Sequence, residues 1–421
     1  MKQQGPKIHI IGAGISGLIA AQVLEEAGFS PVVLEATDTI GGRVKTELFQ
    51  GHQLDHGFQV LLTAYPAAQK YLDYKALELQ KFLPGATIFK NARQVNIGDP
   101  LREISLLFST LFSDIGSFSD KLLILKLNSF LKKKSLTAIF SSKEQTTLAY
   151  LTDFGFSSKM ISNFFSPFFS GIFLETNLAT SSRMFEFVYK MFGEGHAALP
   201  KAGIGAIPKQ LSKKLKNTSF KFNTKVKIVA DTEIELNDGT RLATDFTIVT
   251  TEPSILIPRL KSQETQWKSC YALYFESDKR HIQKPLIGLL PENNTLINNI
   301  FYPSSLATTA TTTTTTRELL SVTVIDSQNL SEEALIENVQ LELKEYCGME
   351  SLSFLKLYHI PKALPKLDDL RYDMPASETR LTSGIFLAGD TQLNGSLNAA
   401  MLSGERAALG VVEAISGTML S

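Results

Sequence analysis

The first 35 residues alternate between short apolar runs and a glycine-rich turn. Residues 7–11 are mostly β-branched and apolar, which is typical of a buried strand. An Ala- and Leu-rich stretch follows the glycines and ends near Gly28, so we expect a helix that a glycine terminates. Residues 31–35 form a second apolar run. The pattern predicts a strand–helix–strand unit whose crossover is right-handed.

The pattern changes twice further along the chain. Between residues 81 and 199, long amphipathic runs such as 104–112 and 121–131 predict a mainly helical region. Residues 219–251 return to short β-type segments, and Asn237, Asp238 and Gly239 supply a hairpin turn between two of them.

The last 40 residues return to an α/β pattern. A strand runs into a Gly-Asp turn over residues 384–390, and a helix follows from about Asn398 to Ile415. Eight threonines occupy the nine positions 308–316, a composition typical of a solvated loop, and we assign this segment no chemistry.

Composition excludes several classes of protein. At roughly 150 residues per domain, 421 residues predict two or three domains. The 42 basic residues balance the 42 acidic ones, so nothing in the net charge favours a nucleic acid partner. The two cysteines, Cys270 and Cys347, are too few for a disulfide framework or a metal cluster, and we expect no metal site. We therefore expect a reduced, cytoplasmic protein.

The N-terminus superficially resembles a signal peptide, but its glycine spacing argues against one. Its apolar stretch is interrupted by His9, Ser16 and Gln22, and so falls short of the ~18 residues that span a membrane. The sequence does not decide whether the protein attaches to a membrane surface.

The glycines between the first strand and helix fit a dinucleotide-binding fingerprint. The first glycine makes the turn, the second lets the backbone approach a pyrophosphate, and the third lets helix and strand pack closely. The residues of this turn are Gly12, Ala13, Gly14, Ile15, Ser16 and Gly17. Glu35, 18 residues after the last glycine, ends the second strand and is followed by Ala36. A carboxylate there suits ribose hydroxyls and disfavours NADP, but it does not separate FAD from NAD.

Three further segments bear on the choice between FAD and NAD. Gly41, Gly42 and Arg43 follow the second strand, and Gly57, Phe58 and Gln59 come about a dozen residues later. Near the C-terminus, Gly389 and Asp390 precede a helix that starts near Leu397. With these motifs the sequence resembles the flavin amine oxidase superfamily, which includes phytoene-type desaturases and protoporphyrinogen oxidases.

The resemblance implies a role for each motif. The Gly-Gly-Arg turn contacts the FAD pyrophosphate, and the segment around Gly57 lies beside the flavin. Asp390 binds the ribityl chain or phosphates, the backbone at Leu397 contacts the flavin, and the strand at Val226 pairs with the adenine. The implied fold is α/β, with a Rossmann-type FAD-binding domain made of a parallel sheet and a β-meander. We assign residues 1–80, 200–258 and 375–421 to it, interleaved with a mixed, largely helical substrate domain at 81–199 and 259–374.

The sequence also departs from the family pattern. Thr37 replaces an arginine usual in amine oxidases, and Ala399 replaces a common glycine. No cysteine follows Cys347, so the resemblance implies non-covalent FAD. The only tryptophan, Trp267, offers no counterpart to the aromatic cage that aligns amines. Residues 358–365 look closer to desaturases and protoporphyrinogen oxidases.

The substrate side gives weaker signals. Eight phenylalanines lie between residues 163 and 192, which indicates either an ordinary core between helices or an apolar wall for a hydrophobic substrate. The lysines at 132–134 end an apolar run and suit either a solvated helix end or a membrane surface. No acid–base constellation emerges, and His56, beside the flavin segment, is the one histidine we single out as a catalytic candidate.

These observations predict an FAD-dependent oxidoreductase that desaturates an apolar, isoprenoid- or carotenoid-like substrate by hydride transfer to flavin N5. The electron acceptor, oxygen or quinone, is left open. The alternatives are a flavin amine oxidase that produces hydrogen peroxide and an FAD-binding structural protein without catalytic activity.

Overall fold

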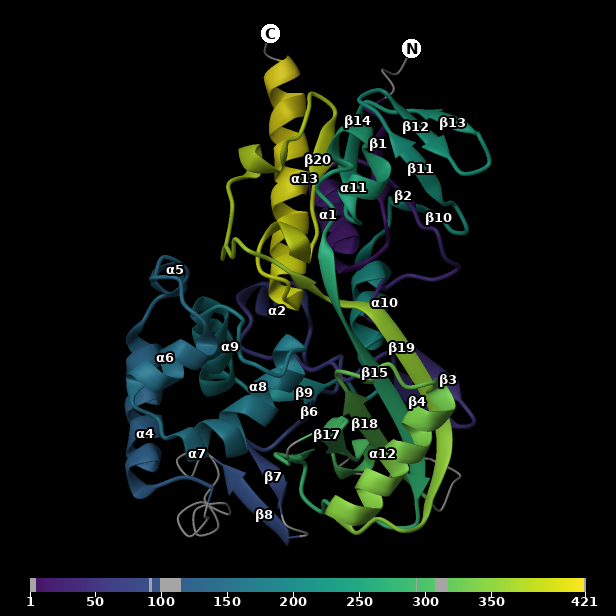
Figure 1. Ribbon diagram of the computed structural model, residues 1–421. Coiled ribbons are helices and arrows are strands. Elements are labelled where there is room, and N and C mark those ends of the chain that lie inside the picture. The colour runs from purple at the N-terminus through teal and green to yellow at the C-terminus, as the bar shows by residue number, and fades with distance from the viewer. Residues whose placement is uncertain (1–4, 91–92, 99–114, 293, 307–316, 420–421) are drawn as a thin grey trace.

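A parallel five-stranded sheet organises one end of the molecule (Figure 1). The computed structural model describes residues 5–90, 93–98, 115–292, 294–306 and 317–419. In spatial order the sheet contains β10 (Ser219–Lys221), β2 (Val32–Leu34), β1 (Ile8–Ile11), β14 (Phe246–Val249) and β20 (Ile385–Leu387). Every neighbouring pair is parallel. Both faces are covered, which explains why β1 is buried at all four positions.

Two helices and a β-meander cover this sheet. The helices α1 (Ile15–Glu26) and α13 (Leu397–Met419) share its larger core, and the meander contributes to the core on the other face. The meander consists of β11 (Val226–Val229), β12 (Glu233–Leu236) and β13 (Arg241–Ala243). The turn predicted at residues 237–239 joins β12 to β13, and Gly239 has the positive φ that the turn requires. Gly28 likewise has a positive φ just after α1, as predicted.

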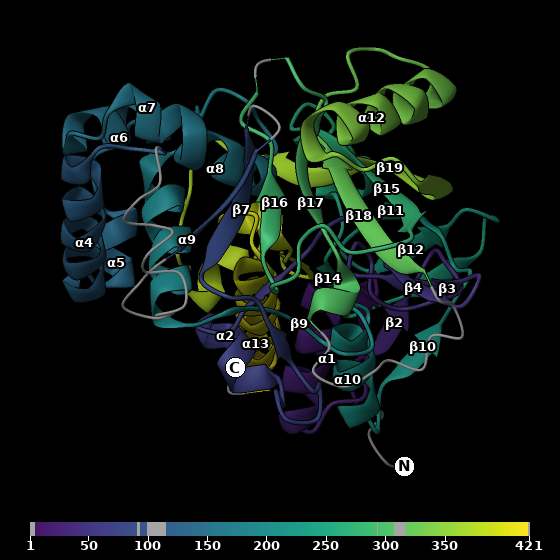
Figure 2. The same ribbon diagram turned by 90° about the horizontal axis from the view of Figure 1, so that it is seen from below.

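A seven-stranded sheet forms the other end. Its spatial order is β19 (Leu352–Lys366), β15 (Gln266–Ser277), β18 (Glu318–Val324), β17 (Ile297–Phe301), β16 (Ile287–Leu289), β7 (Gly85–Lys90) and β8 (Arg93–Gly98). Its pairs are antiparallel except β16 with β7. The helix α12 (Glu332–Cys347) packs along one face (Figure 2).

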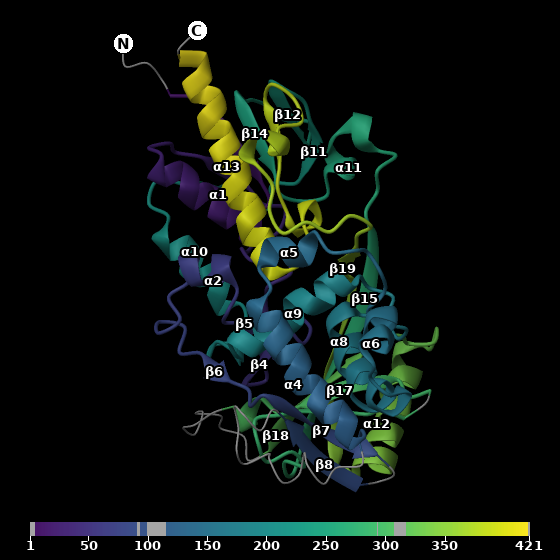
Figure 3. The same ribbon diagram turned by 90° about the vertical axis from the view of Figure 1, so that its left-hand side faces the viewer.

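Helices predicted between residues 81 and 199 are confirmed only for residues 118–194. They form a group beside the seven-stranded sheet (Figure 3): α4 (Phe118–Lys133), α5 (Leu136–Phe140), α6 (Thr147–Phe154), α7 (Ser158–Met160), the π-helical turn 161–165, α8 (Ser166–Phe173) and α9 (Ser182–Glu194). Residues 85–90 and 93–98 are strands instead, because their β-branched and apolar side chains pair across sheet neighbours. The predicted helical run 104–112 and the threonine-rich segment 308–316 lie outside the described residues.

Short elements connect the two ends. They are the hairpin β3 (Thr46–Phe49) and β4 (His52–Asp55), the small sheet of β5 (Leu61–Leu62), β9 (Ala197–Leu199) and β6 (Gln80–Lys81), and the helices α2 (Pro66–Tyr71), α10 (Ala206–Lys214) and α11 (Pro253–Leu256). Across the described residues, each helix is too short or too polar to cross a bilayer.

The C-terminal helix α13 crosses α1 at close range. A Cβ atom added at Gly404 would lie 2.3 Å from the carbonyl oxygen of Ser16, in the first turn of α1. No side chain fits between two backbones at this distance. The crossing therefore fixes the C-terminal helix against the glycine-rich turn of the N-terminus.

We expect Gly404→Ala to lower the free energy of unfolding by roughly 1–3 kcal/mol, because the methyl group forces the helices apart. Urea unfolding of the cofactor-free protein measures the change. Gly417→Ala, on the same helix but with no heavy atom within 4 Å of the added Cβ, is the matched control and should be neutral or slightly stabilising. Equal effects of the two substitutions would contradict the close crossing.

Candidate functional site

The turn between β1 and α1 forms an open backbone cradle. Gly12 has a φ of +104°, and a Cβ at Gly17 would lie 2.1 Å from the Gly12 carbonyl oxygen, so glycine is required at both positions. A Cβ at Gly14, by contrast, would meet no atom within 4 Å. Gly14 is the N-cap of α1, and no side chain caps this helix. The helix therefore presents its first amide groups, and the positive end of its dipole, to an open approach.

The second predicted motif closes over this cradle. Gly41 donates its N–H to the carbonyl of Ala13 at 2.9 Å, and a Cβ at Gly42 would lie 3.3 Å from the Cα of Gly14. Both glycines have positive φ. The two glycine-rich segments, which the sequence predicted separately, thus lie against each other at the N-terminus of α1.

Glu35 is buried at the end of β2 with its carboxylate already oriented. Its Oε2 accepts from the N–H of Ala13 at 2.8 Å, and its Oε1 accepts from the N–H and the hydroxyl of Thr37 at 2.9 and 2.8 Å. Thr37, a departure from the family pattern, therefore holds the acid in place. A carboxylate has about four acceptor positions, which leaves one for a ligand hydroxyl.

The start of β11, which contains Val226, is held near the backbone of Glu35. The N–H of Thr224 donates to the carbonyl of Glu35 at 2.8 Å, and this brings the start of β11 beside the end of β2. Val226 itself is buried, whereas Ala36 is exposed. The residues predicted to hold an adenosine are thus gathered at one edge of the parallel sheet.

Arg43 joins the N-terminal and C-terminal motifs. Its Nη2 lies 2.5 Å from Oδ1 of Asp390, and its Nη1 donates to the carbonyl of Ala363 at 3.3 Å. Its guanidinium carbon lies 5.1 Å from the ring centroid of Trp267. Trp267 in turn donates to Glu252 at 3.0 Å. The tryptophan that offered no amine cage thus supports the arginine through a cation–π contact.

The Gly-Asp turn is held against α13. Gly389 has a φ of +126° and donates its N–H to the hydroxyl of Ser403 at 3.0 Å. Leu397, the predicted flavin contact, is the first residue of α13. Asn398 next to it accepts from the N–H of Ala67 at 3.0 Å.

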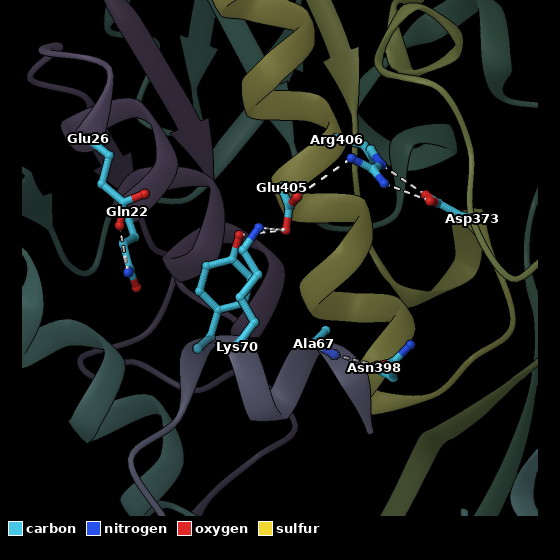
Figure 4. A network of polar contacts seen from close by, with 9 residues as sticks. Gln22, Glu26, Ala67, Lys70, Asp373, Asn398, Glu405 and Arg406 are labelled. Carbon is cyan, nitrogen blue, oxygen red and sulfur yellow. Dashed lines mark hydrogen bonds and ion pairs between the residues drawn. The ribbon is translucent and has the colours of Figure 1, made fainter. Parts of the chain in front are cut away.

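A polar network fixes α2 to α13 (Figure 4). Glu405 accepts from Lys70 at 2.8 Å and from the hydroxyl of Tyr71 at 2.6 Å. On the other side of α13, Arg406 forms two hydrogen bonds with Asp373. These contacts, together with Asn398, set the position of the N-terminus of α13.

The segment predicted to lie beside the flavin is anchored at both sides. Gly57 has a φ of +93°, and the Gln59 amide donates to the carbonyls of Arg43 and His56 at 2.9 and 3.1 Å. The ring of Phe58 lies 4.9 Å from that of Phe301 on β17. This segment therefore links the Gly-Gly-Arg turn to the seven-stranded sheet.

His56 stacks on Tyr358 with 4.5 Å between ring centroids, and its Nε2 lies 3.4 Å from Oε2 of Glu47. Its catalytic role stays a prediction.

The phenylalanine-rich segment contains both fully buried and partly buried rings. Phe165, Phe169, Phe173, Phe185 and Phe187 are buried in the core. Phe164, Phe168 and Phe192 are only partly buried, and Phe168 lies within 5.6 Å of each of the other two rings.

The lysine run ends α4, whose exposed side carries Phe118, Leu122, Leu125 and Phe130. Lys134 pairs with the buried Glu186 at 2.6 Å. A peripheral membrane contact at this helix stays a prediction.

Asp55 is an acidic residue that the sequence motifs did not single out. It ends β4, and its Oδ1 accepts from the hydroxyl of Thr46 at 2.5 Å and from the N–H of Ile204 at 3.1 Å. Burial outweighs both hydrogen bonds and raises the pKa of Asp55 to about 6. Asp55 directly precedes His56 in the sequence, and this position beside the predicted flavin segment was the only sequence signal that pointed to it.

The fold and the joined glycine motifs define a dinucleotide-binding protein of the α/β class. The sequence model of the family described as flavin containing amine oxidoreductase matches residues 15–412. The chain therefore belongs to this family, whose resemblance the sequence motifs had indicated.

Individual relatives are more distant. Protoporphyrinogen oxidase 2 from Arabidopsis thaliana is 25% identical over 171 residues, which cover 40% of this chain and 32% of that protein. The match thus spans about a third of the relative's length.

Two solved structures share the fold. An oxidoreductase from Methanosarcina mazei has a TM-score of 0.73 and 17% identity, with 97% of this chain and 100% of that one covered. Cyclohexylamine oxidase from Brevibacterium oxydans has a TM-score of 0.69 and 14% identity, with 98% and 100% covered.

The raised pKa of Asp55 predicts a pH-dependent stability. The folded pKa of about 6 exceeds the ordinary value of 3.8, so folding favours the protonated form. This contribution is present below about pH 4 and is lost as the pH rises through 6. Asp55→Asn removes the titration and keeps an oxygen acceptor for Thr46 and Ile204.

We expect Asp55→Asn to be more stable than the wild type at pH 7, by about 1–3 kcal/mol at most, and the difference to shrink toward pH 4.5. Urea unfolding of both proteins between pH 4.5 and 8 measures it. A difference that does not change with pH would contradict the raised pKa.

Proposed function

We propose that the protein binds FAD non-covalently and dehydrogenates an apolar, isoprenoid-like substrate. The observation that carries the cofactor assignment is the pairing of Arg43 with Asp390 beside the uncapped N-terminus of α1. This pair joins two motifs that the sequence separates by 347 positions. The partly exposed phenylalanines and the Phe58–Phe301 contact support an apolar substrate.

The residues present fit FAD. The amide groups of residues 12–17 and the side chain of Arg43 suit the pyrophosphate, and the remaining acceptor position of Glu35 suits the ribose. Val226 serves the adenine, Asp390 the ribityl chain or phosphates, and residues 57–59 together with Leu397 the flavin ring. Both cysteines are buried in the substrate region, and burial raises the pKa of Cys270 to about 12, which disfavours a thiol linkage.

When bound, FAD would supply the hydride acceptor for a substrate C–H bond. As the new double bond forms, the substrate loses two electrons and two protons, and an acceptor of the oxygen or quinone class takes the electrons. The protein's residues orient the substrate and exclude water through Phe58, Phe301 and the neighbouring rings. His56 stays the candidate for the second proton.

Substituting Glu35→Gln should weaken FAD binding about tenfold, because a charge-assisted hydrogen bond to the ribose is lost and an amide donor faces the Ala13 or Thr37 N–H. Titration of the apoprotein with FAD, followed by flavin fluorescence, measures the dissociation constant. Asp38→Asn, at an exposed acid in the same loop, is the control and should change it less than twofold. Acid precipitation should release all the flavin, and flavin that stays with the precipitate would contradict non-covalent binding.

Anaerobic incubation of the FAD-loaded protein tests the substrate class. We expect neutral isoprenoid-rich lipid fractions to bleach the flavin absorption and a panel of amines to leave it unchanged. Bleaching by amines, with hydrogen peroxide formed when air is admitted, would favour an amine oxidase instead. A flavin that no fraction bleaches would favour a protein that kept the cofactor fold without the chemistry.

A further inference from the structure

Two hydroxyl groups on β18 are buried with no hydrogen-bond partner among the described residues. Ser321 is 1% exposed and Thr323 is 4% exposed, and neither side-chain oxygen is paired. Buried hydroxyls nearly always have a partner. Valine has nearly the shape of threonine and would fill the same position in the strand without leaving a polar atom unpaired.

These hydroxyls lie on the face of the seven-stranded sheet that is turned away from α12. Leu320, Val322 and Val324 alternate with them and share a core with α12. On the opposite face, Ser321 lies between Tyr274 on β15 and Phe301 on β17. Thr323 lies between Ala272 and Asn299 on the same two strands.

This face adjoins the segment predicted to lie beside the flavin. The hydroxyl of Tyr274 donates to the carbonyl of Asp55 at 2.8 Å, and the ring of Phe301 contacts Phe58. On another side, the amide of Asn298 donates to the carbonyl of Pro167 on α8 at 3.1 Å. The two hydroxyls therefore lie between residues 55–58 and α8.

The two hydroxyl groups differ in the polarity of their cross-strand neighbours. Ser321 lies across the strand pair from Tyr274, a polar residue whose hydroxyl donates to the carbonyl of Asp55. Thr323 faces Ala272, which has no polar side-chain atom, and Asn299, whose amide nitrogen donates to Asn298 at 2.8 Å. Neither cross-strand neighbour of Thr323 is ionisable, so a charged group placed there would be buried unpaired.

We propose that Thr323, with Ser321 beside it, forms a hydrogen-bonding subsite for an uncharged oxygen group, a hydroxyl or a carbonyl, on the apolar substrate. This rests on the proposed function and narrows its substrate class. A pure hydrocarbon leaves the subsite unused, and an amine or carboxylate lacks a counter-charge in it.

Equilibrium binding to the oxidised FAD-loaded protein tests the subsite without turnover. The probes are farnesol and the hydrocarbon that has the same carbon skeleton without the hydroxyl, and the readout is the change in the flavin absorption spectrum. We expect the wild type to bind farnesol about tenfold more tightly than the hydrocarbon, as one hydrogen bond to a buried hydroxyl allows. Thr323→Val should remove this preference, and Thr323→Ser should retain it.

A stability control separates a ligand site from a structural hydroxyl. Thr87 is fully buried in the same sheet and donates to Asn96 at 2.8 Å, so Thr87→Val should lower the unfolding midpoint and keep the preference for farnesol. Thr323→Val should leave the midpoint unchanged or raise it. A lowered midpoint, equal binding of the two probes by the wild type, or a preference that survives in Thr323→Val would overturn the subsite. If neither probe binds, the proposed apolar substrate itself is wrong.

Discussion

Crowding of backbone atoms at the N-terminus of α1 is the constraint on which the rest of the structure depends. The turn at Gly12 folds so tightly that Gly17 touches it, and the backbone of α13 at Gly404 lies against Ser16. No side chain separates these segments. The close contact leaves the first amide groups of α1 open toward a ligand and fixes the last helix of the chain beside them. A residue larger than glycine at position 17 or 404 would push apart the backbone segments that meet there.

The charge of this region is local and nearly balanced. Arg43 is the cation of the Gly-Gly-Arg turn, and it is paired with Asp390 and stacked on Trp267. Its guanidinium is therefore held in one orientation before any ligand arrives, which lowers the entropic cost of binding. Most of the positive potential for a phosphate comes from backbone amides rather than side chains. A chain with no net charge can therefore build an anion site.

The two faces of the seven-stranded sheet differ in composition. The face toward α12 is an ordinary apolar core. The opposite face carries Tyr274, Phe301 and the unpaired hydroxyls of Ser321 and Thr323, and it meets residues 55–58. Stability alone does not explain polar atoms at such positions, because apolar residues of the same shape fit a strand better. The composition of this face is better explained by a ligand than by packing.

Local spacing in the sequence determined the strand–helix–strand unit, the hairpin at residues 237–239, the glycine fingerprint and the position of Glu35 at the end of the second strand. These features depend on residues close in the chain, whose steric and hydrogen-bonding requirements can be read directly. The phenylalanine-rich segment could not be resolved in this way, because a core and an apolar wall have the same composition.

The tertiary structure decided the rest. It brought Arg43 to Asp390 and gave Thr37 and Trp267 supporting roles. It also placed residues 85–90 and 93–98 in a sheet whose other strands come from residues 266–366. It also put Thr323 on the face beside the flavin segment rather than against α12. Such contacts depend on strand register and helix crossing, which arise from interactions distant in sequence, and no local pattern encodes them.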